Sequence, residues 1–102
     1  MPRFDVYRNP NPRASHAFYL DVQSDLVSTA TRWCIPLRLE TPGEPIVSRA
    51  QGIVEIQGAS YVTDTPNLLA VPAGLLRQSV RRLGPAEQSM VEASIEFMLR
   101  GY

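Results

Sequence analysis

Apolar and polar residues alternate along much of the chain, and this alternation predicts a fold rich in β-strands. In a first predicted strand over residues 4–8, Phe4 and Val6 share one face. A second strand over 18–23 alternates in the same way. The two strands are joined by a segment with little apolar content, so we expect them to pair antiparallel.

A third strand is predicted over residues 33–39, with Ile35, Leu37 and Leu39 on one face. Pro36 stands in the middle of this strand and has no amide hydrogen to donate to a neighbour. The sequence therefore predicts an edge position or a bulge there.

The next predicted elements are a hairpin of residues 52–57 and 61–65, then a short strand over 68–71 that stops at Pro72. The stretch 75–83 is ambiguous. Its apolar residues fit a helical period, although it lies in a β-rich chain.

The last element is an amphipathic helix, predicted from Pro85 to Leu99. Gly84 can cap it, proline suits the first helical position, and Arg100 stands at the negative end of the helix dipole. Gly101 is the expected helix stop. The fold class is thus mainly β, an antiparallel sheet with one C-terminal helix, in a single domain over residues 1–102.

Composition narrows the range of functions. The 102 residues carry ten basic and ten acidic side chains, and every basic one is arginine. A net charge of zero argues against direct electrostatic binding to a nucleic-acid backbone. The lack of lysine excludes chemistry that needs a lysine Schiff base. No stretch has the length and apolarity of a membrane span, so we expect a cytoplasmic protein without a membrane partner.

The inventory of catalytic groups is thin. One histidine, His16, and one cysteine, Cys34, do not make a metal site, so we expect neither metal nor cofactor. Cys34 lies in an apolar run typical of a buried free thiol. Asp21 and Asp25 could form an acid/base pair, but carboxylates at a strand end more often accept backbone amides.

The chain end, residues 97–102, combines large apolar side chains, a cation and a terminal tyrosine. Such a segment can pack on the core and leave a loose end, or it can form an interface, because Tyr and Arg often anchor interfaces. The residues alone leave both interpretations open.

Several blocks of the sequence, in order, resemble the CcdB toxins of bacterial toxin–antitoxin modules. They are Phe-Asp-Val-Tyr at 4–7, the Asp-Val-Gln-Ser-Asp-Leu block at 21–26, Ile-Pro-Leu at 35–37, Val-Pro at 71–72 and the C-terminal helix ending at Gly101. The resemblance implies a homodimer, with an SH3-like barrel, a smaller sheet and the helix near the twofold axis.

The resemblance also implies a function without catalysis. The protein would bind the A subunit of DNA gyrase, trap gyrase on cleaved DNA, and be neutralised by a CcdA-like antitoxin. The implied biological role of such a module is plasmid maintenance. The gyrase-binding residues carried over from the family are Leu26, Val27, Glu96, Leu99, Arg100, Gly101 and Tyr102. The best-known member of the family ends in Trp-Gly-Ile, so Arg100 replaces an aromatic residue here, and Glu96 stands where that member has a neutral amide.

Two alternatives accompany this hypothesis. One is a MazF-like endoribonuclease on the same fold, for which Arg32 or Arg81 would act with Thr31 or Asp25. The other is a relic that binds an antitoxin but is not toxic. For the antitoxin, the excess of arginine over acidic residues in 1–20 could receive an acidic tail.

Overall fold

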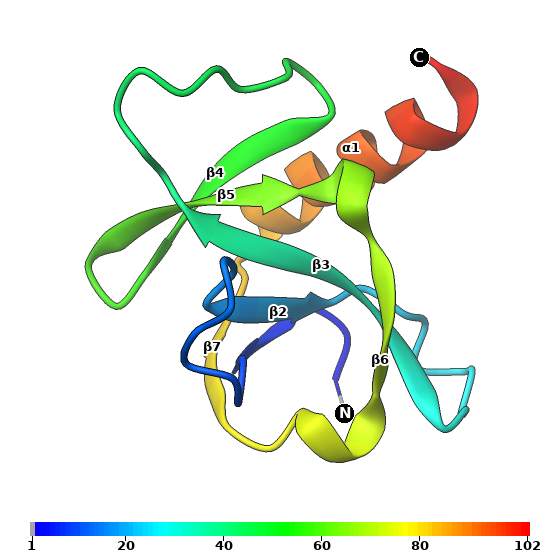
Figure 1. The fold of residues 1–102 in the computed structure, drawn as a ribbon. Helices are drawn as coiled ribbons and strands as arrows, with labels where there is room; N and C mark the ends of the chain where they lie inside the picture. The colour runs from blue at the N-terminus through cyan, green and yellow to red at the C-terminus, as the bar shows by residue number, and fades with distance from the viewer. Residues whose placement is uncertain (1) are drawn as a thin grey trace.

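The computed structural model describes residues 2–102, whose strands form one antiparallel sheet that curls into a half-barrel around the start of the C-terminal helix (Figure 1). The path through the sheet is β4-β5-β3-β2-β1-β7, and β6 pairs with β3 beside it. The elements in chain order are β1 (Asp5–Arg8), β2 (Phe18–Asp21), β3 (Thr31–Leu39), β4 (Gln51–Ile56), β5 (Ala59–Asp64), η1 (Thr65–Asn67), β6 (Leu69–Pro72), η2 (Ala73–Leu75), β7 (Ser79–Arg82) and α1 (Pro85–Arg100). The mainly β fold class is confirmed.

Strand β3 joins the larger and the smaller part of the sheet. Its first residues, 31–34, pair with β6, and its last residues, 37–39, pair with β5. Pro36 falls between these two pairings, where no neighbour on that side needs an amide hydrogen. The prediction of an edge or a bulge was therefore wrong, because β3 is an interior strand that changes its partner at the proline.

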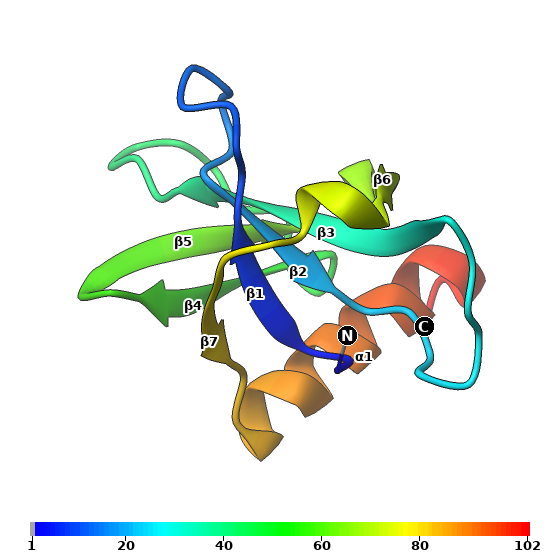
Figure 2. The same ribbon diagram turned by 90° about the horizontal axis from the view of Figure 1, so that it is seen from below.

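Strands β1 and β2 are buried on both faces. Their antiparallel pairing, with Val6 opposite Leu20, confirms the predicted first hairpin. One face contributes Val6 and Leu20 to the main core beneath the helix, and the other contributes Tyr7 and Tyr19 to a second cluster with Cys34. Figure 2 shows the helix lying across one side of the curled sheet.

The ambiguous stretch 75–83 is not helical. Its first residue ends the short η2, and residues 79–82 form β7, which pairs with β1 at the edge of the sheet. Backbone hydrogen bonds to β1, at the edge of the sheet, hold residues 79–82 as a strand. Four apolar residues that match a helical period are too few to predict a helix next to such an edge. The hairpin of β4 and β5 forms as predicted.

The predicted helix is confirmed and runs one residue further, to Arg100. The Glu87 carboxylate accepts the Gly84 amide at 3.0 Å at its start. The helix packs on β4 at Gly52, where a Cβ atom would overlap the Met90 side chain, so glycine permits this close approach. The C-terminal turns of α1 extend beyond the sheet (Figure 1).

The ends of β3 also reach past the core. Leu39, predicted to share the core face with Ile35 and Leu37, is 55% exposed, whereas Ile35 and Leu37 are fully buried. The two-residue period places a side chain on a face, but it does not say how far the covering layer extends. Among the described residues, no helix has the length and apolarity to cross a membrane.

Candidate functional site at the C-terminal end of the helix

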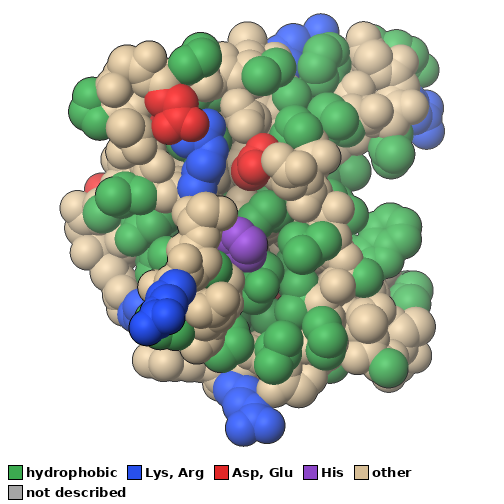
Figure 3. Space-filling view, in the orientation of Figure 1, with side chains coloured by type: hydrophobic (Ala, Val, Ile, Leu, Met, Phe, Trp, Pro, Cys, Tyr) green, Lys and Arg blue, Asp and Glu red, His purple; other side chains and the backbone are tan. Residues whose placement is uncertain are grey.

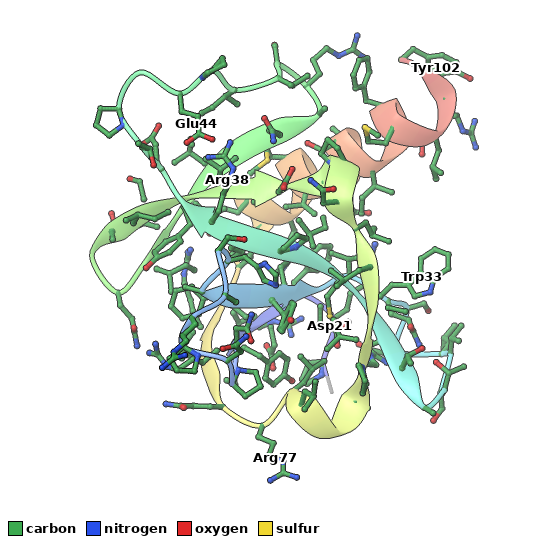
Figure 4. The ribbon with its side chains drawn as sticks, in the orientation of Figure 1. Asp21, Trp33, Arg38, Glu44, Arg77 and Tyr102 are labelled. Carbon is green, nitrogen blue, oxygen red and sulfur yellow. The ribbon has the colours of Figure 1, made fainter. Side chains whose placement is uncertain are left out.

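The last turn of α1 leaves large side chains in solvent. Leu99 is 77% exposed and Tyr102 is 69% exposed. Between them, Gly101 adopts a left-handed conformation (φ 80°), and its amide donates to the Phe97 carbonyl at 2.8 Å. This is the glycine stop that the sequence predicts, and it turns Tyr102 away from the helix axis (Figure 4). Exposed apolar side chains on an ordered turn are typical of an interface.

Glu96 and Arg100 form an ion pair on the surface of this turn. Arg100 Nε lies 2.8 Å from Glu96 Oε1, and the side chains are 59% and 49% exposed, respectively. Because the pair spans one helical turn in solvent, it adds little to stability. Its effect is to hold a cation and its counter-charge at fixed places beside Leu99 and Tyr102.

A groove of about 310 Å³ separates the helix end from the first half of β3. We call it the Trp33 groove, because Trp33, 58% exposed, forms its wall opposite Met98 and Leu99. Figure 4 shows the indole projecting from β3 toward solvent, and Figure 3 shows hydrophobic side chains gathered along this edge of the molecule. Thr65 also lines the groove; its Oγ1 is buried and has no hydrogen-bond partner within residues 2–102.

A second groove, of about 450 Å³, continues from Trp33 along the segment that follows β2. Val27 lines this groove, and its carbonyl accepts hydrogen bonds from Gln23 Nε2 at 2.9 Å and Arg32 Nη1 at 3.4 Å. Leu26 lies beside it, 97% exposed, and lines neither groove. The structure thus connects Val27 to Leu99 through Trp33.

Two more of the carried-over residues, Glu96 and Tyr102, line a third groove of about 350 Å³ together with Arg49. The seven residues carried over from the family therefore do not form one compact site. They divide between the Trp33 side of the helix end and the Arg49 side, with Arg100 and Gly101 between them.

The polar residues near β2 form a hydrogen-bond network, buried at Asp21 and Arg32 and exposed at Asp25, instead of a catalytic pair. Arg32 donates from Nε to Asp21 Oδ2 at 2.8 Å and from Nη2 to Asp21 Oδ1 at 3.0 Å. Asp25 Oδ1 accepts the Arg3 backbone amide at 2.9 Å and lies 3.4 Å from Arg32 Nη2. The hydrogen bonds that Arg32 donates to Asp21 raise the pKa of Arg32, against the opposing effect of burial. As the sequence suggests, Asp21 also accepts a backbone amide, that of Gln23 at 3.1 Å.

The other candidate catalytic groups are occupied or shielded. Arg81 contacts both carboxylate oxygens of Glu87 and donates to the Glu55 carbonyl at 2.8 Å, so its guanidinium group is occupied within the fold. Burial raises the pKa of the Cys34 thiol to about 12, which keeps it protonated at neutral pH. His16 contacts the Tyr19 ring edge-on at a centroid distance of 5.1 Å and is not freely solvated.

Three site residues were missed in the sequence: Trp33, Thr65 and Arg49. Trp33 has the same strand parity as buried Ile35, so the alternation assigns it to the core. Its residue type was the available signal, since tryptophan is over-represented in binding hot spots. For Thr65 and Arg49 no local pattern exists, because folding alone brings them to the helix end.

The family model of the CcdB protein matches residues 3–101 of the chain. The chain belongs to the CcdB family. It is accordingly a toxin of a type II toxin–antitoxin system and a poison of DNA gyrase, and it acts without catalysis. No curated protein matches the chain.

Membership of the CcdB family also decides between the alternative functions that the sequence left open. The partners of the family are the gyrase A subunit and the antitoxin CcdA. The structure also argues against the endoribonuclease alternative. Its two candidate catalytic arginines are already paired, Arg32 with Asp21 and Arg81 with Glu87.

Proposed function

We propose that this CcdB protein binds the gyrase A subunit through the C-terminal end of α1, by Leu99, Arg100, Gly101 and Tyr102. Glu96 contributes through its ion pair with Arg100, and Val27 and Leu26 extend the surface on the far side of Trp33. The observation that carries the proposal is the exposure of Leu99 (77%) and Tyr102 (69%) on a turn whose backbone is fixed by the glycine stop. Such a surface loses little conformational entropy on binding.

We further propose that two copies of the chain associate through the part of the Trp33 groove formed by Trp33 and Met98, while Leu99, more exposed than Met98 (77% against 45%), stays available to gyrase. Trp33 and Met98 present apolar surface across the groove, and the two residues are 58% and 45% exposed. In a symmetric dimer each chain contributes the same patch. This association would bring both helix ends to one side and double the binding surface.

The antitoxin would bind elsewhere in this proposal. A groove of about 510 Å³ lies between the 9–13 segment and η2, with Arg8 and Arg77 among its lining residues and no acidic side chain. Figure 4 shows Arg77 extending from this end of the molecule into solvent. An extended acidic segment of CcdA fits this charge and shape.

The test of gyrase binding is deletion of Gly101 and Tyr102. We expect the wild-type toxin to stop growth when expressed without antitoxin, and to trap purified gyrase on cleaved DNA, whereas the shortened chain does neither. Its thermal unfolding midpoint should stay close to that of the wild type, because neither residue is part of the core. Toxicity of the shortened chain would refute the proposed site.

The test of the dimer is sedimentation of the wild type and of Trp33→Glu at micromolar concentration. A charge in the groove should leave the variant monomeric, because two carboxylates would be buried face to face. Arg77→Glu is the control for an added acidic group at a remote surface, and it should remain dimeric. A monomeric wild type would contradict this part of the proposal.

A further inference from the structure

Arg49 is held beside the helix end in an unusual conformation. Its backbone has φ 71°, in the left-handed region that residues other than glycine rarely adopt. Its guanidinium carbon lies 4.6 Å from the centroid of the Phe97 ring. Stacking on the ring covers one face of the guanidinium group, while its N–H groups stay at the edges, where a carboxylate can accept two of them.

The charge of Arg49 is not matched within the described part of the chain. Most arginines in residues 2–102 lie within 4.0 Å of a carboxylate oxygen, as Arg32 and Arg81 do. No carboxylate of residues 2–102 lies within that distance of Arg49. Glu96, the carboxylate on the same side of the helix, is paired with Arg100. Arg49 therefore presents a cation on this side of the helix end that no carboxylate of residues 2–102 pairs with at close range.

Arg49 also opens onto the groove that Glu96 and Tyr102 line. The groove has a volume of about 350 Å³, and Gln51 and Ser94 add polar groups to its wall. A partner that covers Tyr102 would therefore reach Arg49 as well. Strained backbone in a residue other than glycine often marks a functional position, and here the strained residue borders the proposed binding surface.

We propose that Arg49 belongs to the gyrase-binding surface and receives a carboxylate side chain of the A subunit. This inference rests on the proposed function, since it extends the surface formed by Leu99, Arg100 and Tyr102. Phe97 acts as a positioning residue, because its ring holds the guanidinium plane in place before the partner arrives. A fixed arginine pairs with a carboxylate through two parallel hydrogen bonds, which adds specificity as well as affinity.

The experiment is a measurement of affinity between purified toxin variants and the gyrase A subunit at low and at high salt. Arg49→Gln keeps a long polar side chain on the same backbone and should weaken binding about tenfold at low salt. Arg49→Glu should weaken it further through like-charge repulsion. The wild type should lose more affinity with added salt than Arg49→Gln does, because an ion pair between partly exposed groups is screened.

Arg77→Gln is the matched control. Arg77 is exposed, and its Nε donates to the Gly74 carbonyl at 2.7 Å, far from the helix end in Figure 4. It should bind gyrase like the wild type. If Arg49→Gln also binds within about twofold of the wild type at both salt concentrations, the inference about Arg49 is wrong.

The deletion of Gly101 and Tyr102, measured in the same assay, separates this inference from the proposed function. Loss of binding in the deletion together with unchanged binding in Arg49→Gln refutes only the role of Arg49. Full binding by the deletion refutes the helix-end site itself. Circular dichroism of each variant should match the wild type, since Arg49 is exposed and outside the core.

Discussion

Asp21–Arg32 and Glu96–Arg100 are both arginine–carboxylate pairs, but they differ in burial. The Asp21 side chain is fully buried and that of Arg32 is 8% exposed, whereas about half of each side chain of the second pair is in solvent. Arg32 donates hydrogen bonds to acceptors within the chain, on Asp21, Gln23 and Val27. Arg100 makes one contact through Nε, which leaves its outer nitrogens for a partner.

The difference shows how one kind of interaction serves the fold in one place and recognition in another. A buried pair is fixed by its surroundings, and removing one partner strands a charge away from water. An exposed pair contributes little to stability, yet it can offer charge to a partner at a fixed place. Arg32 also holds the Val27 carbonyl, so the buried pair supports the segment that borders the second groove.

The largest effect is expected for Arg32→Ala. The substitution leaves the Asp21 carboxylate buried without its cation and should lower the free energy of unfolding by about 3–5 kcal/mol. Urea denaturation measures this. The double variant Asp21→Leu, Arg32→Met should be more stable than Arg32→Ala, because no buried charge remains. A loss for Arg32→Ala below about 1 kcal/mol would contradict the structural role of the pair.

Arg100→Ala should show the reverse pattern. We expect affinity for the gyrase A subunit to fall about tenfold, because arginine is a frequent hot-spot residue. The free energy of unfolding should change by less than about 1 kcal/mol, since the pair is exposed. Calorimetric titration and urea denaturation of the same preparation measure both quantities. A large loss of stability with unchanged affinity would reverse the roles assigned to the two pairs.

The smallest effect is expected at a third pair, Arg81–Glu87, whose burial lies between the other two. The hydrogen bond from Arg81, helped by the Gly84 amide, holds the pKa of Glu87 below its ordinary value of 4.5. A carboxylate with a lowered folded pKa stabilises the fold above its unfolded pKa, and this contribution is lost as the pH falls through the folded value.

Below about pH 4.5, the wild type should therefore lose more stability than Glu87→Gln does, by about 1 kcal/mol. Urea denaturation at a series of acidic pH values measures the difference, and Glu96→Gln is the matched control on the same helix. Parallel curves for the wild type and Glu87→Gln would show that the pair has no effect on stability.

Regular elements were predictable because their signals are local. The strands around Val6 and Leu20 follow a two-residue period, and the helix combines its own period with proline at the start and glycine at the stop. The partner change at Pro36 was not predictable, because it depends on how two segments far along the chain divide the edge of β3.

The candidate site was predictable only in part. The family's motif placed Leu99, Arg100 and Tyr102 at the helix end, and the structure exposes all three. Trp33 and Arg49 reach this end through the fold: the strand alternation assigns Trp33 wrongly to the core, and no local pattern marks Arg49. The pairing of Asp21 with Arg32 likewise links two strands, which residue spacing does not indicate.

The central claim is that the helix end contacts gyrase while the buried pair only supports the fold. Hydrogen exchange of the full-length toxin, free and bound to the gyrase A subunit, tests it most directly. We predict that bound gyrase slows exchange in residues 96–102 and 24–31, and leaves residues 9–13 and 73–78 unchanged. Slowed exchange confined to 9–13 and 73–78, with 96–102 unaffected, would contradict the account.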